Sequence, residues 1–144
     1  MTELLIVIAI IGTLLAFAVL ALNNARAKSR DSKRVSDIQV IRAALEQHWI
    51  QNASYPAAAS FQNLGTGSYA TLSSNGFQAS PGTGVIYLQA LPTGPRVNEY
   101  YQYRSTVTTG YAISFVTELP TTFGNAGTYY AHGNGDVDTD SSSK

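Results

Sequence analysis

Residues 3–22 read Glu-Leu-Leu-Ile-Val-Ile-Ala-Ile-Ile-Gly-Thr-Leu-Leu-Ala-Phe-Ala-Val-Leu-Ala-Leu. After the glutamate, nineteen consecutive residues carry no charge. As an α-helix rising about 1.5 Å per residue, this run extends about 28 Å, close to the hydrocarbon thickness of a bilayer. The sequence therefore predicts an apolar helix that lies in lipid or against other apolar helices.

The helix is expected to continue well beyond this apolar run. Apolar side chains recur at helical spacing through the next stretch: Val35, Ile38, Ile41, Leu45 and Trp49. No proline occurs before Pro56, where Asn, Ser and Pro together end the helix. We therefore predict one helix from about Thr2 to about Gln51. Residues 1–24 form its apolar half, and residues 25–52 form its amphipathic half.

Five of the nine basic residues follow the apolar run within nine positions, and we call them the basic collar: Arg26, Lys28, Arg30, Lys33 and Arg34. The collar is expected to be a solvated helix face that contacts anionic headgroups or neighbouring subunits. By the positive-inside rule, a collar of this kind favours the cytoplasmic side of a membrane.

The rest of the chain is poor in charge, and strand-like segments gather near its end. Residues 53–98 are rich in Ser, Thr, Gly, Ala and Asn, which predicts a long irregular connection. Residues 99–105, 111–119 and 128–132 are aromatic or β-branched and are bounded by Gly or Pro. Residues 99–144 are therefore expected to form an antiparallel sheet and a polar C-terminal tail. The expected fold class is α+β: a long N-terminal helix whose apolar first half protrudes and whose second half packs on a small antiparallel sheet of three or four strands.

Length and composition exclude several classes of function. The 144 residues correspond to about one domain, which excludes a multidomain enzyme. The absence of cysteine excludes a thiol nucleophile and a Cys-ligated metal. Nine basic residues balance nine acidic residues, so nucleic-acid binding is not indicated. No acid, base and nucleophile set is recognisable, and the sequence predicts a protein that is not an enzyme and needs no cofactor or small-molecule substrate.

Glu3 is the charged residue that adjoins the apolar run, and two interpretations stay open. Glu3 could lie among headgroups, where an anion near a helix N-terminus is stabilised by about 0.3–1 kcal/mol. It could instead pair with a cation of another copy, for which a free α-amino group is the natural candidate. At about 4 Å and an effective dielectric of about 20, that attraction is about 4 kcal/mol. Such a pair would fix the axial register of packed helices.

Four stretches together resemble the type IV pilins and the type II secretion pseudopilins: Glu3-Leu-Leu-Ile-Val-Ile-Ala-Ile-Ile-Gly12, the collar within residues 25–34, the stripe ending in Tyr55-Pro56, and Tyr87-Leu-Gln-Ala-Leu-Pro92. The resemblance covers about residues 1–56 well and the remainder in outline. It implies a subunit that is held in the cytoplasmic (inner) membrane by its N-terminal helix, with its C-terminal domain outside. The subunit then polymerises into an extracellular surface filament whose core is made of these helices.

The resemblance also implies partners and roles for particular residues. In that family a glutamate at the position of Glu3 pairs with a neighbour's N-terminal amine, which a prepilin peptidase exposes by removing a leader, usually followed by N-methylation. The implied partners are other copies of the chain, the membrane, the prepilin peptidase and the pilus assembly machinery. The implied inter-subunit contacts are Met1, Glu3, Leu4, Leu5, Ile8, Ile11, Leu15 and Leu22.

This chain departs from the family pattern at two points. Members usually begin Phe-Thr-Leu-Ile-Glu, two residues longer before the glutamate, which leaves the mature start open. Many members also carry a proline where this chain has Leu20, and filament helices are often unwound nearby, so any unwinding here is expected at Gly12. The pilin interpretation places the collar outside the cytoplasm, which conflicts with the positive-inside rule. We favour the pilin interpretation, because a removed leader would have carried basic residues of its own that the rule would have to count.

Two other functions stay open: a pseudopilin of a type II secretion system, and a single-pass membrane-anchored binding domain. The long stretch 47–95 without a formal charge favours a pilus subunit. A secretory signal peptide is disfavoured because the apolar run starts with an acidic residue and is longer than about 7–15 residues.

Two weaker candidate sites complete the sequence interpretation. Asp136, Asp138 and Asp140 have the spacing of a calcium loop but lack its glycine and glutamate, so a solvated tail is favoured over a calcium site. Asn52 begins an Asn-Ala-Ser triplet that is a possible glycosylation acceptor, although we favour the simpler interpretation that it ends the helix.

Overall fold

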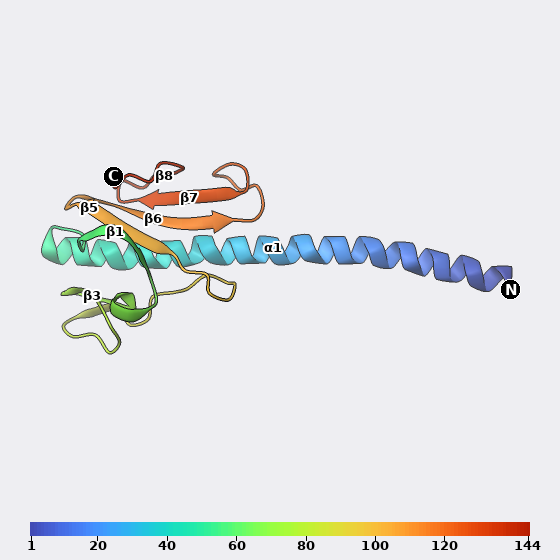
Figure 1. Ribbon diagram of the computed structural model, residues 1–144, viewed down its shortest axis with the longest axis horizontal. Helices are drawn as coiled ribbons and strands as arrows, with labels where there is room; N and C mark the ends of the chain where they lie inside the picture. Colours follow the sequence, from blue (N-terminus) through green and yellow to red (C-terminus); the bar gives the residue numbers. More distant parts are fainter.

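The computed structural model describes residues 1–144, apart from the side chain of Val107. The helix α1 (Thr2–Asn52) runs through the whole molecule, and its C-terminal half packs into a head formed by residues 53–144 (Figure 1). The helix ends where Ala53 adopts a left-handed conformation, with φ of 50°, and its N–H bonds to the Trp49 carbonyl. The expected α+β, pilin-like architecture with a protruding apolar half is confirmed.

The larger sheet of the described chain has five antiparallel strands in the order β1-β5-β6-β7-β8. Its members are β1 (Ala58–Asn63), β5 (Gln102–Val107), β6 (Gly110–Thr117), β7 (Gly127–His132) and β8 (Val137–Asp138). Strands β5, β6 and β7 coincide with the three predicted segments to within a few residues. The predicted size of three or four strands was too small, because β1 pairs along β5 and β8 pairs along β7 at the two edges.

Residues 53–98 are more ordered than the expected irregular connection. Besides β1 they contain the 3-10 helix η1 (Gly67–Tyr69) and a second antiparallel sheet in the order β3-β2-β4. Its strands are β2 (Thr71–Ser73), β3 (Gly76–Gln78) and β4 (Ile86–Leu88). Strands of three residues are too short to show a period of two in the sequence. They are held instead by burial, since Leu72 is completely inaccessible to solvent.

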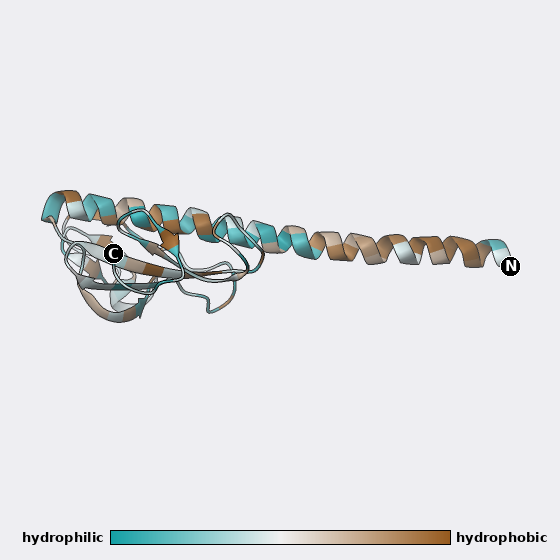
Figure 2. Ribbon diagram, turned by 90° about the horizontal axis from the view of Figure 1, so that it is seen from above, coloured by the Kyte–Doolittle hydropathy of each residue, from teal (hydrophilic) through white to brown (hydrophobic). Residues whose placement is uncertain are grey.

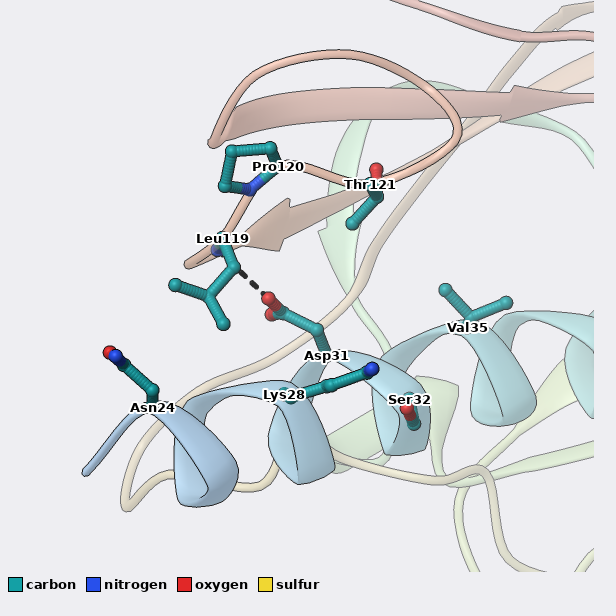
Figure 3. A pocket seen from close by; sticks show the side chains of 8 residues that line it. All are labelled: Asn24, Lys28, Asp31, Ser32, Val35, Leu119, Pro120 and Thr121. Atoms are coloured by element: carbon teal, nitrogen blue, oxygen red, sulfur yellow. Dashed lines mark hydrogen bonds between the residues drawn. The ribbon is translucent and has the colours of Figure 1, made fainter. Parts of the chain in front are cut away.

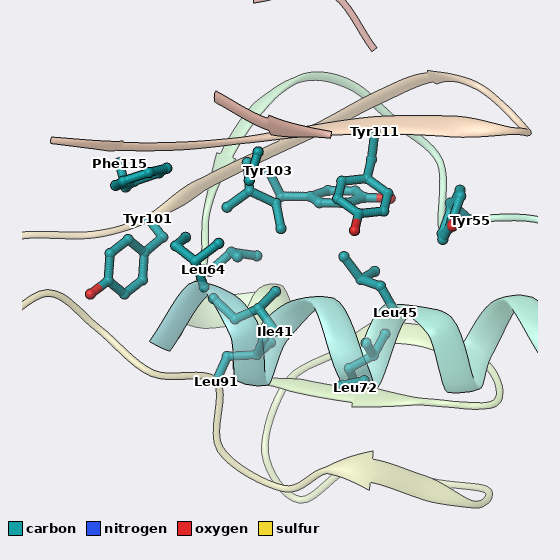
Figure 4. Close-up of a cluster of buried hydrophobic side chains, with 14 of the residues drawn as sticks. Ile41, Leu45, Tyr55, Leu64, Leu72, Leu91, Tyr101, Tyr103, Tyr111 and Phe115 are labelled. Atoms are coloured by element: carbon teal, nitrogen blue, oxygen red, sulfur yellow. The ribbon is translucent and has the colours of Figure 1, made fainter. Parts of the chain in front are cut away.

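The core fills the space between α1 and the two sheets, which lie on opposite sides of the helix (Figures 1 and 4). Ile38, Ile41 and Leu45 of the predicted stripe are buried in it, and Trp49 is partly buried, with its ring stacked on Tyr55 at 4.8 Å between centroids. The strands and the segments beside them contribute aliphatic and aromatic side chains: Leu64, Leu72, Leu91, Tyr101, Tyr103, Tyr111, Ile113 and Phe115. Burying each large apolar side chain stabilises the fold by about 1.5–3 kcal/mol, so this stripe holds the helix in the head.

The polar C-terminal segment is packed on the head, unlike the solvated tail expected from the sequence. Strand β8 pairs with β7, and the last residues then return to the sheet. The carbonyl of Lys144 accepts hydrogen bonds from the backbone N–H groups of Tyr111 and Gly133. Arg104 donates to the carbonyl of Ser141.

Candidate functional site

The N-terminal half of α1 exposes apolar side chains on every side. Fourteen large apolar side chains between Met1 and Leu22 are each at least 49% exposed. Figure 2 shows this hydrophobic half as the part of the helix that extends beyond the head. The helix is long and apolar enough to cross a membrane, and none of the apolar window is buried within the described chain. The head does not cover these apolar side chains, so only lipid or another protein chain can remove them from water.

The predicted inter-subunit residues all lie on this exposed half. Leu4, Ile8, Ile11, Leu15 and Leu22 recur at intervals of three, four and seven residues, which places them along one face of the helix. Leu5 lies to the side of that face. The structure thus gathers most of the predicted residues into one long apolar strip.

Glu3 lies at the exposed end of the apolar half of α1. Glu3 and its neighbours Met1 and Thr2 are solvent-exposed, and the helix begins at Thr2 without a side-chain cap. The Glu3 carboxylate has no ion-pair partner among the described residues. An unpaired negative charge therefore lies at the end of a long apolar helix.

The helix passes through Gly12 without interruption. A Cβ added at this glycine would meet no atom within 4 Å, so its surroundings do not require a glycine. Unwinding at Gly12 in a filament stays a prediction.

Arg34 of the collar is buried, contrary to the expected solvated face. Its guanidinium makes two parallel hydrogen bonds to Glu99, with Nε–Oε1 at 2.6 Å and Nη2–Oε2 at 2.9 Å. Nη1 donates to Asp31 Oδ1 and Glu118 Oε1, both at 2.7 Å. The hydrogen bonds to Glu99, more than the other contacts, raise the pKa of Arg34 against the opposing effect of burial. A charged side chain can be buried here because three carboxylates surround it.

Two more arginines complete this ion network around Glu118. Arg30 donates from Nε to Glu118 Oε1 at 2.8 Å and from Nη2 to Glu118 Oε2 at 2.6 Å, and Arg96 also donates to this carboxylate. The hydrogen bonds from Arg30 and then Arg34 hold the pKa of Glu118 well below its usual range. Asp31 accepts from the backbone N–H groups of Glu118 and Leu119 at 2.9–3.0 Å. The network thus joins the helix to the end of β6.

The remaining collar residues differ in their surroundings. Lys33 pairs with Asp37 at 2.5 Å. Arg26 and Lys28 are exposed, and the described residues supply no ion pair to either. Three collar residues, Arg26, Lys28 and Lys33, are therefore exposed as expected, and only Arg26 and Lys28 lack an ion pair within the described chain.

A groove lies beside Lys28, where the helix leaves the head. It has a volume of about 670 Å³ and lies between one face of α1 and the loop after β6 (Figure 3). Asn24, Lys28 and Ser32 line the helix side, while Leu119 and Pro120 line the loop side. Asp31 spans the base of the groove, where its carboxylate bonds to the Leu119 N–H.

Two of the three aspartates of the calcium candidate form ion pairs within the head, and the third, Asp136, accepts a hydrogen bond from the Asn134 amide. Asp138 contacts His132 Nε2 at 3.0 Å and Lys144 Nζ at 2.8 Å, and Asp140 contacts the same ammonium. Lys144, followed by His132, lowers the pKa of Asp138 to about 2. Among the described residues, no cluster of three or more His, Cys, Asp or Glu side chains could hold a metal ion.

Asn52, the possible glycosylation acceptor, lies at the exposed end of the helix. Its side-chain amide donates to the carbonyls of His48 and Ser74 at 3.1 and 3.3 Å. The amide therefore links the end of the helix to the second sheet.

Asp31, Glu99 and Glu118 are the functional residues that the sequence interpretation missed. Glu99 and Glu118 are separated from Arg34 by 65 and 84 positions, and no local pattern connects them. Only 12% of the residues are charged, so a single carboxylate beside a predicted strand stands out. Such a carboxylate could have been taken as a signal that a cation pairs with it in the fold.

Comparisons of the chain with models of protein families, with curated proteins and with solved structures found no match.

Proposed function

We propose that this chain is the structural subunit of a helical, type IV pilus-like surface filament. The observation that carries the proposal is the exposed apolar half of α1, which ends in the unpaired carboxylate of Glu3. The unassembled subunit is held in the inner membrane by this half of the helix. In the filament, the same surface packs against the helices of neighbouring copies.

Apolar burial alone does not favour the filament over the membrane. Lipid covers the exposed leucines and isoleucines about as well as neighbouring helices do, because both remove them from water. The charges at the tip do distinguish the two states. Pairing Glu3 with a neighbour's amine satisfies two charges that would otherwise lie unpaired at the membrane, where the cost rises with depth. Extraction of the whole helix from lipid still requires energy from assembly machinery.

The continuity of the helix supports a retained anchor over a cleaved signal peptide. The sequence Ala25-Arg26-Ala27 imitates a small-residue cleavage site, but Ala27 is buried against the head. Asp31 and Arg34 of the ion network follow within two turns. Cleavage at this point would remove the turn that leads directly into the packed helix.

Electron microscopy of shed surface material tests the proposal. Filaments of the full chain are expected, and Glu3→Ala or Glu3→Lys is expected to abolish them while membrane insertion persists. Asp136→Asn is the matched control, because it neutralises another exposed carboxylate on the distant head. A dispersed membrane protein that behaves identically in all variants would contradict the proposal and favour a single-pass anchored binding domain.

A co-expression experiment isolates the pairing itself. A Glu3→Ala copy still offers its amine to the Glu3 of a wild-type neighbour. It should therefore enter filaments when wild-type chains are present, although it forms none alone. If tagged Glu3→Ala copies are excluded from wild-type filaments, the proposed pairing between Glu3 and the amine is wrong.

A further inference from the structure

We propose that the groove beside Lys28 binds the headgroup of an anionic phospholipid while the subunit is in the membrane. The proposal rests on the membrane-anchored state described under the proposed function and assigns that state a lipid site. It starts from the collar, where the head provides ion pairs for some cations and leaves others without them.

The two unpaired collar cations lie at the depth of lipid headgroups. Arg26 and Lys28 follow the last residue of the apolar run by four and six positions, about 6 and 9 Å along the helix axis. The phosphates of a bilayer begin just outside the hydrocarbon layer. A basic side chain near an anionic membrane surface is stabilised by about 1 kcal/mol, equivalent to about a fivefold gain in binding.

The groove has a volume and a mixed polar and apolar lining that suit a phospholipid headgroup. Its volume of about 670 Å³ lies within the usual range for small-molecule sites. Lys28 supplies a cation for the phosphate, and Asn24 and Ser32 supply hydrogen-bonding groups beside it. Leu119 and Pro120 form an apolar wall for the glycerol backbone (Figure 3).

The charges around the groove favour an anion there. Asp31 is the acidic residue in the lining, but Arg34 and two backbone N–H groups compensate its carboxylate. Lys28 has no such compensation in the described chain. A second copy of this chain is the less suitable occupant, because the head carries few exposed carboxylates. Anionic phospholipid headgroups present such a charge at the depth of the collar.

Lipid retention by the full chain in detergent micelles tests this site. The protein is purified with equal amounts of phosphatidylglycerol and phosphatidylcholine, and the bound lipid is counted by native mass spectrometry. Preferential retention of phosphatidylglycerol is expected, with an about fivefold loss in Lys28→Gln. Ser32→Trp, which fills the groove without changing charge, should cause a similar loss.

Lys33→Gln is the matched control, because it removes a collar charge that already pairs with Asp37 and does not line the groove. The proposal would be overturned if the two lipids were retained equally, or if Lys28→Gln and Lys33→Gln caused equal losses. Equal losses would mean that the overall charge of the collar, and not the groove, attracts the lipid. Unchanged retention in Ser32→Trp, or a dimer cross-linked through Ser32, would also overturn it. Alkaline extraction of membranes separates the two proposals, since a chain that resists extraction but shows no lipid preference refutes only the lipid site.

Discussion

Replacing Arg34 with methionine is expected to destabilise the head by about 3–5 kcal/mol. Methionine keeps the length and the apolar part of the side chain but removes the guanidinium. Arg34 is 1% exposed and makes four hydrogen bonds to three carboxylates. Removing it takes away a cation shared by all three carboxylates.

The magnitude follows from what each carboxylate retains. Glu118 keeps Arg30 and Arg96, and Asp31 keeps two backbone N–H groups. Glu99 keeps only a long bond of 3.3 Å from the Arg96 N–H among the described contacts. Most of the loss should therefore come from Glu99. The double variant Arg34→Met/Glu99→Gln should cost less than the sum of the single variants, by about 0.5–3 kcal/mol.

Urea unfolding of the full chain in mild detergent measures this change. Trp49 is the sole tryptophan and packs on Tyr55, so its fluorescence reports the head rather than the apolar half of the helix. Lys28→Met is the matched control and should change the free energy of unfolding by less than about 0.5 kcal/mol. A loss below about 1 kcal/mol in Arg34→Met, with no coupling to Glu99, would refute this account of the network.

Two further predictions concern the core. Leu45→Ala should lower the free energy of unfolding by about 2–5 kcal/mol, because Leu45 is fully buried, whereas Val40→Ala on the exposed face should have a small effect in the same urea titration. Burial raises the pKa of Tyr111 to about 12, and the pKa values of Tyr55 and Tyr103 are also raised. Because these values exceed the ordinary value of 10.0, their contribution to stability is complete below pH 10 and is lost as pH rises through 12 and above. In a titration to high pH, part of the tyrosinate absorbance should therefore appear only well above pH 10, together with the change in Trp49 fluorescence that reports unfolding. Ionisation of all tyrosines near pH 10 in a head that is still folded would contradict this.

The helix was predictable because its signals are local. The uncharged run, the stripe from Val35 to Trp49 and the position of Pro56 give its extent nearly to the residue. Strands β5 to β7 were predictable for the same reason, since β-branched and aromatic residues fill them between turns.

Strand β1 was missed because its sequence contains no strand signal. It reads Ala-Ala-Ser-Phe-Gln-Asn and is held by its pairing with β5, whose partner residues lie 39 to 47 positions further along the chain. Only Ala58 of this strand is buried, and Phe61 instead lies beneath the guanidinium of Arg104 at 4.5 Å. Pairing with a distant strand and a cation–π contact produce no periodic pattern in the sequence from which a strand could be predicted.

The collar was misinterpreted for a related reason. Helical spacing places Arg30 and Arg34 on one face, but it does not reveal what lies opposite. Whether a basic face is solvated or buried depends on acidic residues that folding brings from distant positions. Here Glu99 and Glu118 come from the two ends of the β5–β6 region, so only the tertiary structure distinguishes Arg34 from Lys28.

The ion network, together with the buried stripe, fixes how the head is oriented on the apolar half of α1, and this leads to a prediction for the proposed filament. Arg34 lies 31 residues from Glu3, about 46 Å along one uninterrupted helix. Because Asp31 and Arg34 fix the helix against Glu118, the face carrying Leu4 and Leu15 points in a fixed direction relative to the head. Pairing at the tip should therefore determine where each neighbouring head lies.

Weakening the ion network should disorder the heads of the filament without disordering its helical core. Filaments of Arg34→Met are expected to keep an ordered helical core, because their apolar strip and Glu3 are intact, while the density of their heads becomes weak after averaging. Cryo-electron microscopy of wild-type and variant filaments measures both. Heads as well ordered as in the wild type would mean that contacts between neighbouring heads, rather than Arg34 within each subunit, determine their orientation.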